Sequence, residues 1–259
     1  MTNTAQKVMN TSDVSGSKDV VIKITNLKKG FGSQPVLKNV SLQLMNGENL
    51  AILGKSGSGK SVLIKCIVRL LNPDDGVINV LGEDMRALNS KHLGEIRKKI
   101  GFLFQSGALY DSMTVKQNLE FPLRRIKKHL VQKEIDGKVK EALDHVGLSD
   151  AIDKMPSQLS GGMRKRISLA RTIVVDPQIM LYDEPTTGLD PITSNEISTL
   201  INDVQKKYKT SSIIITHDIA CARLTANRVI MLKDGEVYLD GTLAEFEKTT
   251  DPLITSFFK

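Results

Sequence analysis

Hydrophobic and polar positions divide the chain into two kinds of segment. Short, almost wholly apolar stretches are typical of strands buried on both faces of a sheet, and they are Val20–Ile24, Asn49–Leu53, Ile179–Asp183, Ser212–Thr216 and Arg228–Leu232. Helical patterns lie between them. In Ser194–Tyr208 the apolar side chains recur every three or four residues. Strands that alternate with helices predict an α/β fold, in which a parallel sheet carries helices on its faces.

The middle of the chain follows a different pattern. From about Ser106 to Ser157 the apolar spacing is helical, with Lys133–Val146 as one helix, and no stretch is typical of a strand. We interpret this region as a helical insert in the α/β domain. A basic stretch inside it could face a partner protein, acidic lipid headgroups or only solvent; it consists of Arg124, Arg125, Lys127 and Lys128.

The composition narrows the class of protein only a little. The chain has 259 residues, of which 40% are hydrophobic and 25% charged, as in an ordinary globular domain. No apolar run approaches the roughly 18 residues of a membrane span. The net charge of +7 fits nucleic acid, an anionic membrane or simple solubility. With 4% aromatic residues and no Trp the chain offers few base-stacking platforms, so we expect no nucleic-acid partner.

The N-terminal residues and the cysteines add two minor expectations. Residues 1–19 are polar and lack the apolar segment of a signal peptide, so we expect a disordered tail in a cytoplasmic protein, followed by one domain over 20–259. Cys66 and Cys221 have no metal-ligand spacing and are expected to be buried, reduced thiols.

A glycine-rich loop lies between an expected strand and an expected helix. Residues 54–61 fit the phosphate-binding pattern G-x-x-x-x-G-K-[ST], after Asn49–Leu53 and before the helical run Ser61–Leu71. The glycines let backbone N–H groups point at phosphate oxygens, and the helix N-terminus adds partial positive charge. The alternative, a Gly/Ser turn that only caps a helix, is disfavoured by this setting. The candidate phosphate-binding residues are Gly54, Lys55, Ser56, Gly57, Ser58, Gly59, Lys60, which should reach the β- and γ-phosphates, and Ser61, which should bind Mg²⁺.

The candidate ligands of this loop end at Ser61. The next residue, Val62, is not a second serine or threonine, so no binding role is assigned to position 62.

Polar residues end two of the apolar strands. Asp183 is placed to hold Mg²⁺, and Glu184 points to the other side, where it could polarise an attacking water. Solvated acids are the alternative, which the apolar strand before them disfavours. His217 ends another strand, and ligands bind at the carboxyl ends of such strands, so it could donate to a γ-phosphate. A lone histidine is otherwise more often structural.

A second anion-binding pattern follows the helical insert. Ser160, Gly161 and Gly162 stand at the start of a helix, where backbone N–H groups can bind phosphate. One compact chain can hardly bring this loop and the first to the same nucleotide, whereas two copies facing head to tail could. An ordinary helix N-cap is the competing interpretation.

Together these residues resemble the ATP-binding cassette (ABC) family from about residue 20 onward. The resemblance implies a P-loop NTPase with a RecA-like core, an antiparallel β subdomain and a helical subdomain at about residues 106–160. It implies an ATPase that uses ATP and Mg²⁺ as a homodimer, in which Ser160 and Gly162 bind the γ-phosphate held by the opposite subunit. Phe31 would stack on adenine, Gln105 would contact Mg²⁺ and the attacking water, and Asp190 would lie at the dimer interface.

A smaller group within that family is similar at further positions. The run Phe104–Val115, the stretch Phe121–Leu123, and Met163, where most of the family has Gln, resemble the ATPases of Mla-type, MCE-associated phospholipid transporters. This implies a subunit on the cytoplasmic face of the inner membrane, beneath an integral-membrane permease. It would power phospholipid transport across the cell envelope, with an MCE-type lipid-binding protein on the far side.

Two other functions stay open at this point. An importer ATPase for a small solute, such as an amino acid, would carry the same nucleotide-binding motifs. A non-transport ABC ATPase acting on DNA or the ribosome would fit the basic charge. Such proteins typically carry two cassettes in one chain or a long coiled-coil insert, and this sequence has neither.

Overall fold

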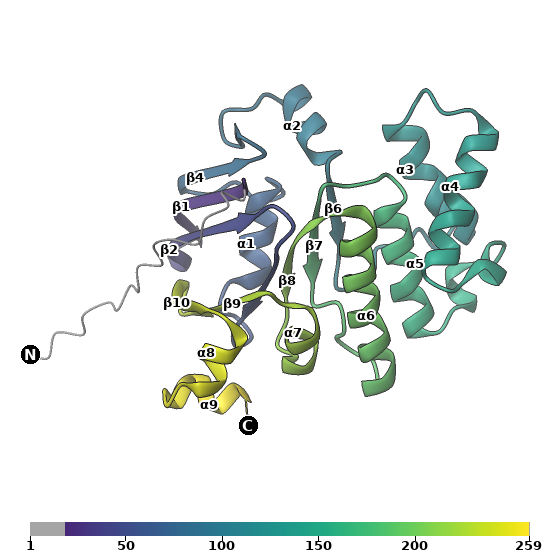
Figure 1. Ribbon diagram of the computed structural model, residues 1–259. Coiled ribbons are helices and arrows are strands. Elements are labelled where there is room, and N and C mark those ends of the chain that lie inside the picture. Colours follow the sequence, from purple (N-terminus) through teal and green to yellow (C-terminus); the bar gives the residue numbers. More distant parts are fainter. Residues whose placement is uncertain (1–18, 259) are drawn as a thin grey trace, which may run out of the picture.

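A single ten-stranded sheet contains all the predicted strands. The computed structural model describes residues 19–258, so residues 1–18 of the expected tail lie outside the described part. The strand order is β5-β4-β1-β2-β10-β9-β3-β8-β7-β6 (Figure 1). The predicted strands are present as β1 (Val20–Phe31), β3 (Asn49–Leu53), β7 (Ile179–Asp183), β8 (Ser211–Ile215) and β9 (Arg228–Lys233).

The parallel half of the sheet is covered on both faces. β6 (Ile100–Leu103), β7, β8, β3 and β9 run parallel, as predicted. On one face α1 (Lys60–Ile67) packs its Leu63 against Ile52 and Ile213. On the other face α6 (Pro191–Tyr208) packs Ile197 and Ile201 against Tyr182 and Ile214. Neighbouring residues of a strand face opposite sides of the sheet, so a continuous apolar strand contributes to both cores. Because the strands are parallel, their carboxyl ends meet at one edge of the sheet.

Apart from β1, the antiparallel strands were not visible as continuous apolar runs. β2 (Gln34–Met45), β4 (Asp75–Val80) and β5 (Glu83–Asp84) pair antiparallel with β1 or with one another, and β10 (Glu236–Gly241) pairs with β9. β2 buries alternate residues, among them Val40, Leu42 and Leu44, because only one of its faces is covered. The antiparallel β unit that the family resemblance implied is therefore present.

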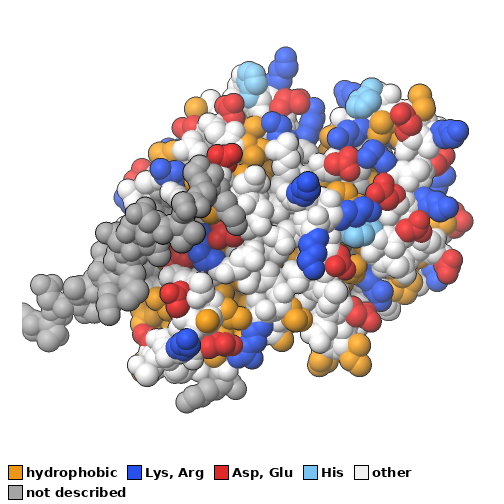
Figure 2. Space-filling view, in the orientation of Figure 1, with side chains coloured by type: hydrophobic (Ala, Val, Ile, Leu, Met, Phe, Trp, Pro, Cys, Tyr) orange, Lys and Arg blue, Asp and Glu red, His pale blue; other side chains and the backbone are white. Residues whose placement is uncertain are grey.

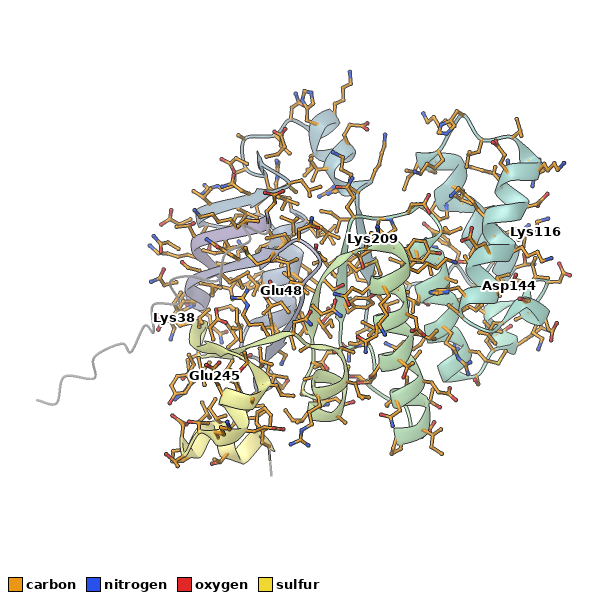
Figure 3. The ribbon with its side chains drawn as sticks, viewed as in Figure 1. Lys38, Glu48, Lys116, Asp144, Lys209 and Glu245 are labelled. Atoms are coloured by element: carbon orange, nitrogen blue, oxygen red, sulfur yellow. The ribbon has the colours of Figure 1, made fainter. Side chains whose placement is uncertain are left out.

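The helical insert forms a unit with an apolar core of its own. Within the described chain, residues 106–160 contain α3 (Val115–Ile126), α4 (Gln132–His145) and two 3-10 turns, Ser149–Ala151 and Pro156–Gln158, and no strand. This unit lies beside the sheet, where Figure 3 labels Lys116 and Asp144. α5 (Gly161–Ile173) is shared between the two parts. Its Ile167 packs with Leu119 and Val139 of the helical unit, whereas its Leu169 and Ile173 pack in the sheet's core.

Shorter helices complete the domain. α2 (Ser90–Arg97) precedes β6, α7 (Ile219–Thr225) follows β8, and α8 (Leu243–Lys248) and α9 (Pro252–Phe258) end the described chain (Figure 1). Cys66 and Cys221 are buried free thiols, as predicted, and burial raises the pKa of each to about 11.

Candidate functional site

The glycine-rich loop links the fully buried strand β3 to α1. Gly59 caps α1 with φ of 101°, a left-handed conformation that glycine adopts without strain. A Cβ at Gly59 would lie 2.7 Å from Leu37 Cδ2, and one at Gly54 would lie 2.5 Å from the Leu232 carbonyl oxygen. The close approach of neighbouring backbone and side chains therefore requires glycine at both positions.

Lys60 lies folded into this loop. Its Nζ donates to the carbonyl oxygens of Gly54 at 2.6 Å and Lys55 at 3.3 Å, and it lies 3.8 Å from Glu184 Oε1. Burial lowers the pKa of Lys60, and the nearby carboxylates of Glu184 and Asp183 oppose this shift. An ammonium group held by two carbonyl oxygens at the N-terminus of α1 is well placed to contact phosphate oxygens.

An oxygen pair beside the loop fits a small hard cation. Ser61, at the start of α1, donates its hydroxyl hydrogen to Asp183 Oδ1 at 2.8 Å. Mg²⁺ prefers oxygen ligands and is usually held by one or two protein groups together with substrate phosphates. Within the described loop the buried Ser58 hydroxyl has no hydrogen-bond partner, so it could also meet a phosphate. Two of the three predicted metal ligands, Ser61 and Asp183, are thus adjacent, and the third, Gln105, lines the same cleft as Ser61.

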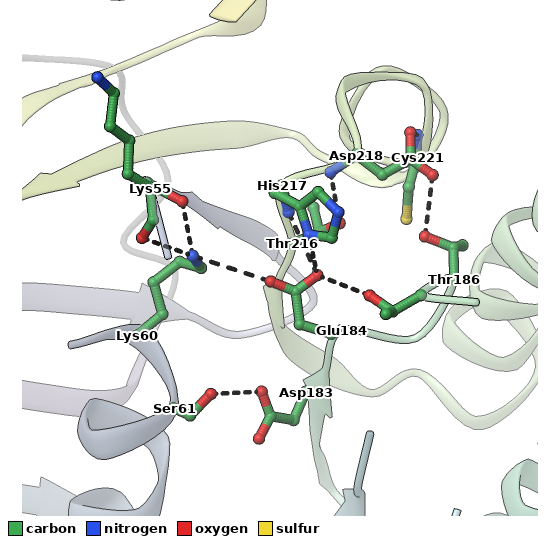
Figure 4. A network of polar contacts seen from close by, with 12 residues as sticks. Lys55, Lys60, Ser61, Asp183, Glu184, Thr186, Thr216, His217, Asp218 and Cys221 are labelled. Atoms are coloured by element: carbon green, nitrogen blue, oxygen red, sulfur yellow. Dashed lines mark hydrogen bonds and ion pairs between the residues drawn. The ribbon is translucent and has the colours of Figure 1, made fainter. Parts of the chain in front are cut away.

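Glu184 is separated from Asp183 by an abrupt turn of the backbone. Its φ is 51°, left-handed for a residue with a side chain, and its N–H donates to the Ile215 carbonyl oxygen at 2.9 Å. Its Oε2 lies 2.7 Å from His217 Nδ1 and accepts from the Thr187 hydroxyl at 3.2 Å. Figure 4 shows Lys60, Glu184 and His217 in one network of contacts. The turn directs the two neighbouring acids to different partners.

Most of these groups line one open cleft of about 620 Å³, which is in the range of small-molecule sites. Asp183, which accepts from the Ser61 hydroxyl, is not among the lining residues. The cleft collects residues from the glycine-rich loop and from the ends of β6, β7 and β8, as expected for the carboxyl edge of a parallel sheet. The exposed His217 side chain lies at its opening. Its lining includes Ser56, Gly57, Gly59, Lys60, Ser61, Val62, Gln105, Glu184 and His217.

Val62 is an apolar member of this lining. It was assigned no binding role from the sequence, and its partly buried side chain packs against the apolar core of the sheet. Position 62 therefore offers a ligand apolar contact and no side-chain oxygen.

Phe31 lies outside the residues that line the cleft. It ends β1 opposite Gln34, which does line the cleft, and its ring is half exposed with Lys29 Nζ 5.5 Å from the ring centroid. Its predicted contact with a base therefore depends on a ligand that extends past Gln34.

The second anion-binding loop lies apart from the cleft. Ser160 is exposed and caps α5, its Oγ accepting from Met163 N–H at 3.2 Å, and neither it nor the two glycines line the cleft. Asp190 caps α6 through Thr193 N–H at 3.0 Å, and a Cβ on Gly162 would lie 2.6 Å from Thr193 Cγ2. Ser160–Gly162 and Asp190 therefore belong to one surface, distinct from the glycine-rich loop of the same chain.

Two further polar residues near the site were not predicted from the sequence. Lys165 of α5 is buried, and its Nζ donates to the carbonyl oxygen of Gln105 and lies 3.4 Å from that of Glu184. Asn118 of α3 is fully buried and binds the backbone of residues 110–114. A charged or amide residue inside an otherwise apolar helical stripe is the signal that could have identified both.

The basic stretch of α3 is partly neutralised. Arg124 pairs with Glu120 at 2.9 Å, Lys127 lies 3.8 Å from Asp176, and the Arg125 guanidinium lies 5.2 Å from the centre of the Phe121 ring. Figure 2 shows Lys and Arg side chains intermixed with Asp and Glu over this part of the surface. The stretch does not form a surface of one sign.

Comparison with known proteins agrees with this geometry. A family model described as ABC transporter matches residues 37–187. The "Probable ribonucleotide transport ATP-binding protein mkl" of Mycobacterium leprae is 40% identical over 92% of this chain and 68% of its own length. The intermembrane phospholipid transport system ATP-binding protein MlaF of Haemophilus influenzae is 37% identical over 92% of this chain and 90% of its own. The methionine import ATP-binding protein MetN of Clostridium tetani is 35% identical over 87% and 70%.

A solved structure of similar fold represents a dimer after hydrolysis. It is a dimeric ATP-binding cassette bound to ADP and inorganic phosphate, with a TM-score of 0.78 and 35% identity, and it covers 86% of this chain and 98% of its own. Among the helices of residues 19–258, none has the length and apolar character needed to cross a membrane.

Proposed function

The chain belongs to the ABC transporter family and is an ATPase that powers transport, and on this premise we propose that its cargo is phospholipid. In this proposal it acts as a homodimer at the cytoplasmic face of the inner membrane, beneath an integral-membrane permease. An MCE-type lipid-binding protein completes the system beyond the membrane. The segment Phe104–Val115 carries the proposal, and the likeness to MlaF over most of that protein's length supports it.

The segment Phe104–Val115 begins at the cleft and leads into the helical unit. Asn118 accepts from Tyr110 N–H at 2.8 Å and donates to the carbonyl oxygens of Tyr110 and Met113. Arg171 donates to the Ala108 carbonyl oxygen at 2.9 Å and its guanidinium lies 4.8 Å from the centre of the Tyr110 ring. These contacts hold the segment firmly, so a shift of Gln105 at the cleft would be passed on to the helical unit. They therefore support a role of the segment in transmitting movement from the nucleotide to the permease.

In the proposed hydrolysis each group around the cleft has one task. The glycine-rich loop and Lys60 hold the phosphates, and Ser61 and Asp183 would hold Mg²⁺, which supplies charge neutralisation when bound. Glu184 accepts a proton from the attacking water, and the water oxygen then bonds to the γ-phosphorus. The bond between the γ-phosphorus and the β–γ bridging oxygen breaks in the same step, and ADP leaves. His217, next to Glu184 Oε2, orients that carboxylate and donates to the γ-phosphate.

The separation of the two loops supports a shared site. Two copies facing head to tail would place Ser160 and Gly162 of one chain over the nucleotide bound to the loop of the other. Nucleotide bound in either cleft would then contribute to closure, and closure would drive the permease. Asp190, on the same surface as Gly162, would lie at the junction.

Isolation of the intact complex tests the cargo. The tagged chain is purified in mild detergent from its own cells, and the accompanying proteins and lipids are identified by mass spectrometry. We expect a permease, an MCE-type protein and bound phospholipid, and ATP-dependent movement of a labelled phospholipid after reconstitution into vesicles. The same complex with Glu184→Gln serves as the inactive control.

A small solute is the second candidate cargo. The likeness to MetN, an importer of methionine by name, favours it to a lesser degree. A complex that contains a solute-binding protein, and whose ATP hydrolysis rises with an amino acid but not with phospholipid, would establish this alternative and overturn the lipid proposal.

A further inference from the structure

One lysine outside the cleft joins three segments of the site. Lys165 lies in α5, five positions after Ser160, and only 7% of its surface is exposed. Its Nζ donates to the main-chain oxygen of Gln105 and lies 3.4 Å from the main-chain oxygen of Glu184. A single ammonium group thereby connects the helix of the Ser160 loop to the segments that follow β6 and β7.

Packing alone is a poor reason for this lysine. Removal of an ammonium group from water is costly unless hydrogen bonds compensate, and a methionine would fill a similar space without that cost. The compensating partners are backbone oxygens of two residues of the cleft. The contact therefore fixes the position of their main chain, which apolar packing would not specify.

The contact matters most at Glu184, because the backbone there is strained. A left-handed non-glycine residue persists only where its surroundings hold it in place. The N–H of Glu184 is held by the Ile215 carbonyl oxygen of β8, and its carbonyl faces Lys165. The same carbonyl oxygen also accepts from Thr187 N–H, at 3.3 Å, within the turn that Glu184 begins. Loss of Lys165 would therefore leave this carbonyl held only by its own turn and no longer by α5, and the direction of the carboxylate would be less well defined.

We propose that Lys165 is a positioning residue for hydrolysis, which holds Glu184 and Gln105 in fixed relation to α5. Since α5 begins with the loop that meets the partner's nucleotide in the proposed dimer, Lys165 also connects the arrival of that nucleotide with the placement of the general base. This inference rests on the proposed function of Glu184 and deepens it.

Substitution of Lys165 separates positioning from packing. Lys165→Met keeps most of the side-chain length and removes the donors, whereas Lys165→Arg keeps donors. Lys206→Met, on the exposed side of α6, is the matched control. We expect Lys165→Met to lower kcat by about 10- to 100-fold, the usual effect of a misplaced catalytic group. KM for ATP should stay within about twofold, since the phosphate-binding loop is untouched, and Lys165→Arg should recover most of kcat.

A double-mutant cycle tests the connection to Glu184. In a Glu184→Gln background Lys165→Met should cause little additional loss of kcat, because the group that Lys165 positions is already absent. The proposal would be overturned if Lys165→Met lowered kcat by the same factor in the Glu184→Gln background as in the wild type. A folded Lys165→Met enzyme with wild-type kcat would overturn it as well. If Lys165→Met and Lys165→Gln both fail to fold while Lys165→Arg folds, the role is structural and the proposal is wrong. If Glu184→Gln alone hydrolyses ATP normally, the proposed general base is wrong instead, and the two failures are distinguishable.

Discussion

At the scale of single residues, the chemistry of the site depends on where Glu184 directs its carboxylate. Glu184→Gln should lower kcat by roughly 10²–10⁴-fold, because an amide cannot accept the proton of the attacking water. ATP affinity should change little, since Lys60 and the loop backbone are intact. Steady-state hydrolysis and equilibrium binding of a labelled nucleotide measure the two quantities. Normal hydrolysis by this variant would contradict the assignment.

Asn118 is a second residue whose role can be measured. Its side chain satisfies the Tyr110 N–H and three carbonyl oxygens of residues 110–114. Asn118→Leu should destabilise the protein by about 1–3 kcal/mol, the penalty of buried polar groups left without partners. Urea unfolding gives the free energy, with Asn195→Leu on the exposed side of α6 as the control. Equal stability of both variants would show that the bracing is unimportant.

The residues of the cleft differ in how far the sequence could predict them. Lys60 and Ser61 follow from the glycine-rich pattern, and Asp183 and His217 follow from their positions at strand ends, because the carboxyl edge of a parallel sheet brings such positions together. Lys165 could not be placed, since its partners are backbone oxygens more distant in the chain, and those contacts exist only after α5 has packed. Backbone strain at Glu184 is likewise a product of the folded arrangement.

At the scale of secondary-structure elements, α4 and α6 join the helical unit to the core. The His145 ring packs edge-on against Tyr208 with 5.8 Å between ring centres, and Glu141 pairs with Lys207 at 2.9 Å. Burial, and next the charge of Lys207, lower the pKa of His145, while Asp203 and Glu141 oppose the shift. The folded protein therefore disfavours the charged imidazole at this contact.

This contact predicts a loss of stability in acid. As pH falls through the ordinary histidine pKa of about 6.5, the unfolded chain takes up a proton at His145 before the folded chain does, which favours unfolding until the lower folded pKa is reached. The free energy of unfolding should thus fall less between about pH 8 and about pH 5 in His145→Gln than in the wild type. His92→Gln, on exposed α2, is the control. Parallel curves for His145→Gln and the wild type would contradict the prediction.

The element pattern also shows why half of the sheet was missed. Wholly apolar stretches marked β3, β7 and β8 because helices cover both of their faces. β2 buries only alternate positions, and β6 spans just Ile100–Leu103, too short to distinguish from the neighbouring helical pattern. The helical insert, in contrast, was predicted from spacing alone.

At the scale of the whole molecule, the distance between the two loops predicts complementation. Lys60→Ala damages the phosphate-binding loop. Gly161→Asp places a negative charge where the partner's phosphate would bind, and an acid there suits a helix N-terminus, so the fold should be kept. Each variant alone should be inactive. Their equal mixture should regain about a quarter of wild-type activity, since half of the dimers are mixed and each of these has one of two intact sites.

Differently tagged copies make this experiment decisive. Capture through both tags isolates mixed dimers, and the double variant Lys60→Ala/Gly161→Asp mixed with wild type provides the control, because its mixed dimers have no intact site. Captured mixed dimers of the two single variants that remain inactive would contradict the head-to-tail arrangement.

The separate apolar core of the helical unit has a consequence for how the protein can change over generations. Leu119 of α3 and Val139 of α4 pack in one cluster with α5. Residues on the outer faces of α3 and α4 can therefore be substituted without disturbing the sheet. In the proposed transporter, mutations there would change the surface that this unit offers to the permease and leave the nucleotide-binding residues intact. α5 packs against both the helical unit and the sheet, so it should tolerate the fewest amino-acid substitutions. A saturation mutagenesis library selected only for ATP hydrolysis would then accumulate more variation on the outer faces of α3 and α4 than along α5.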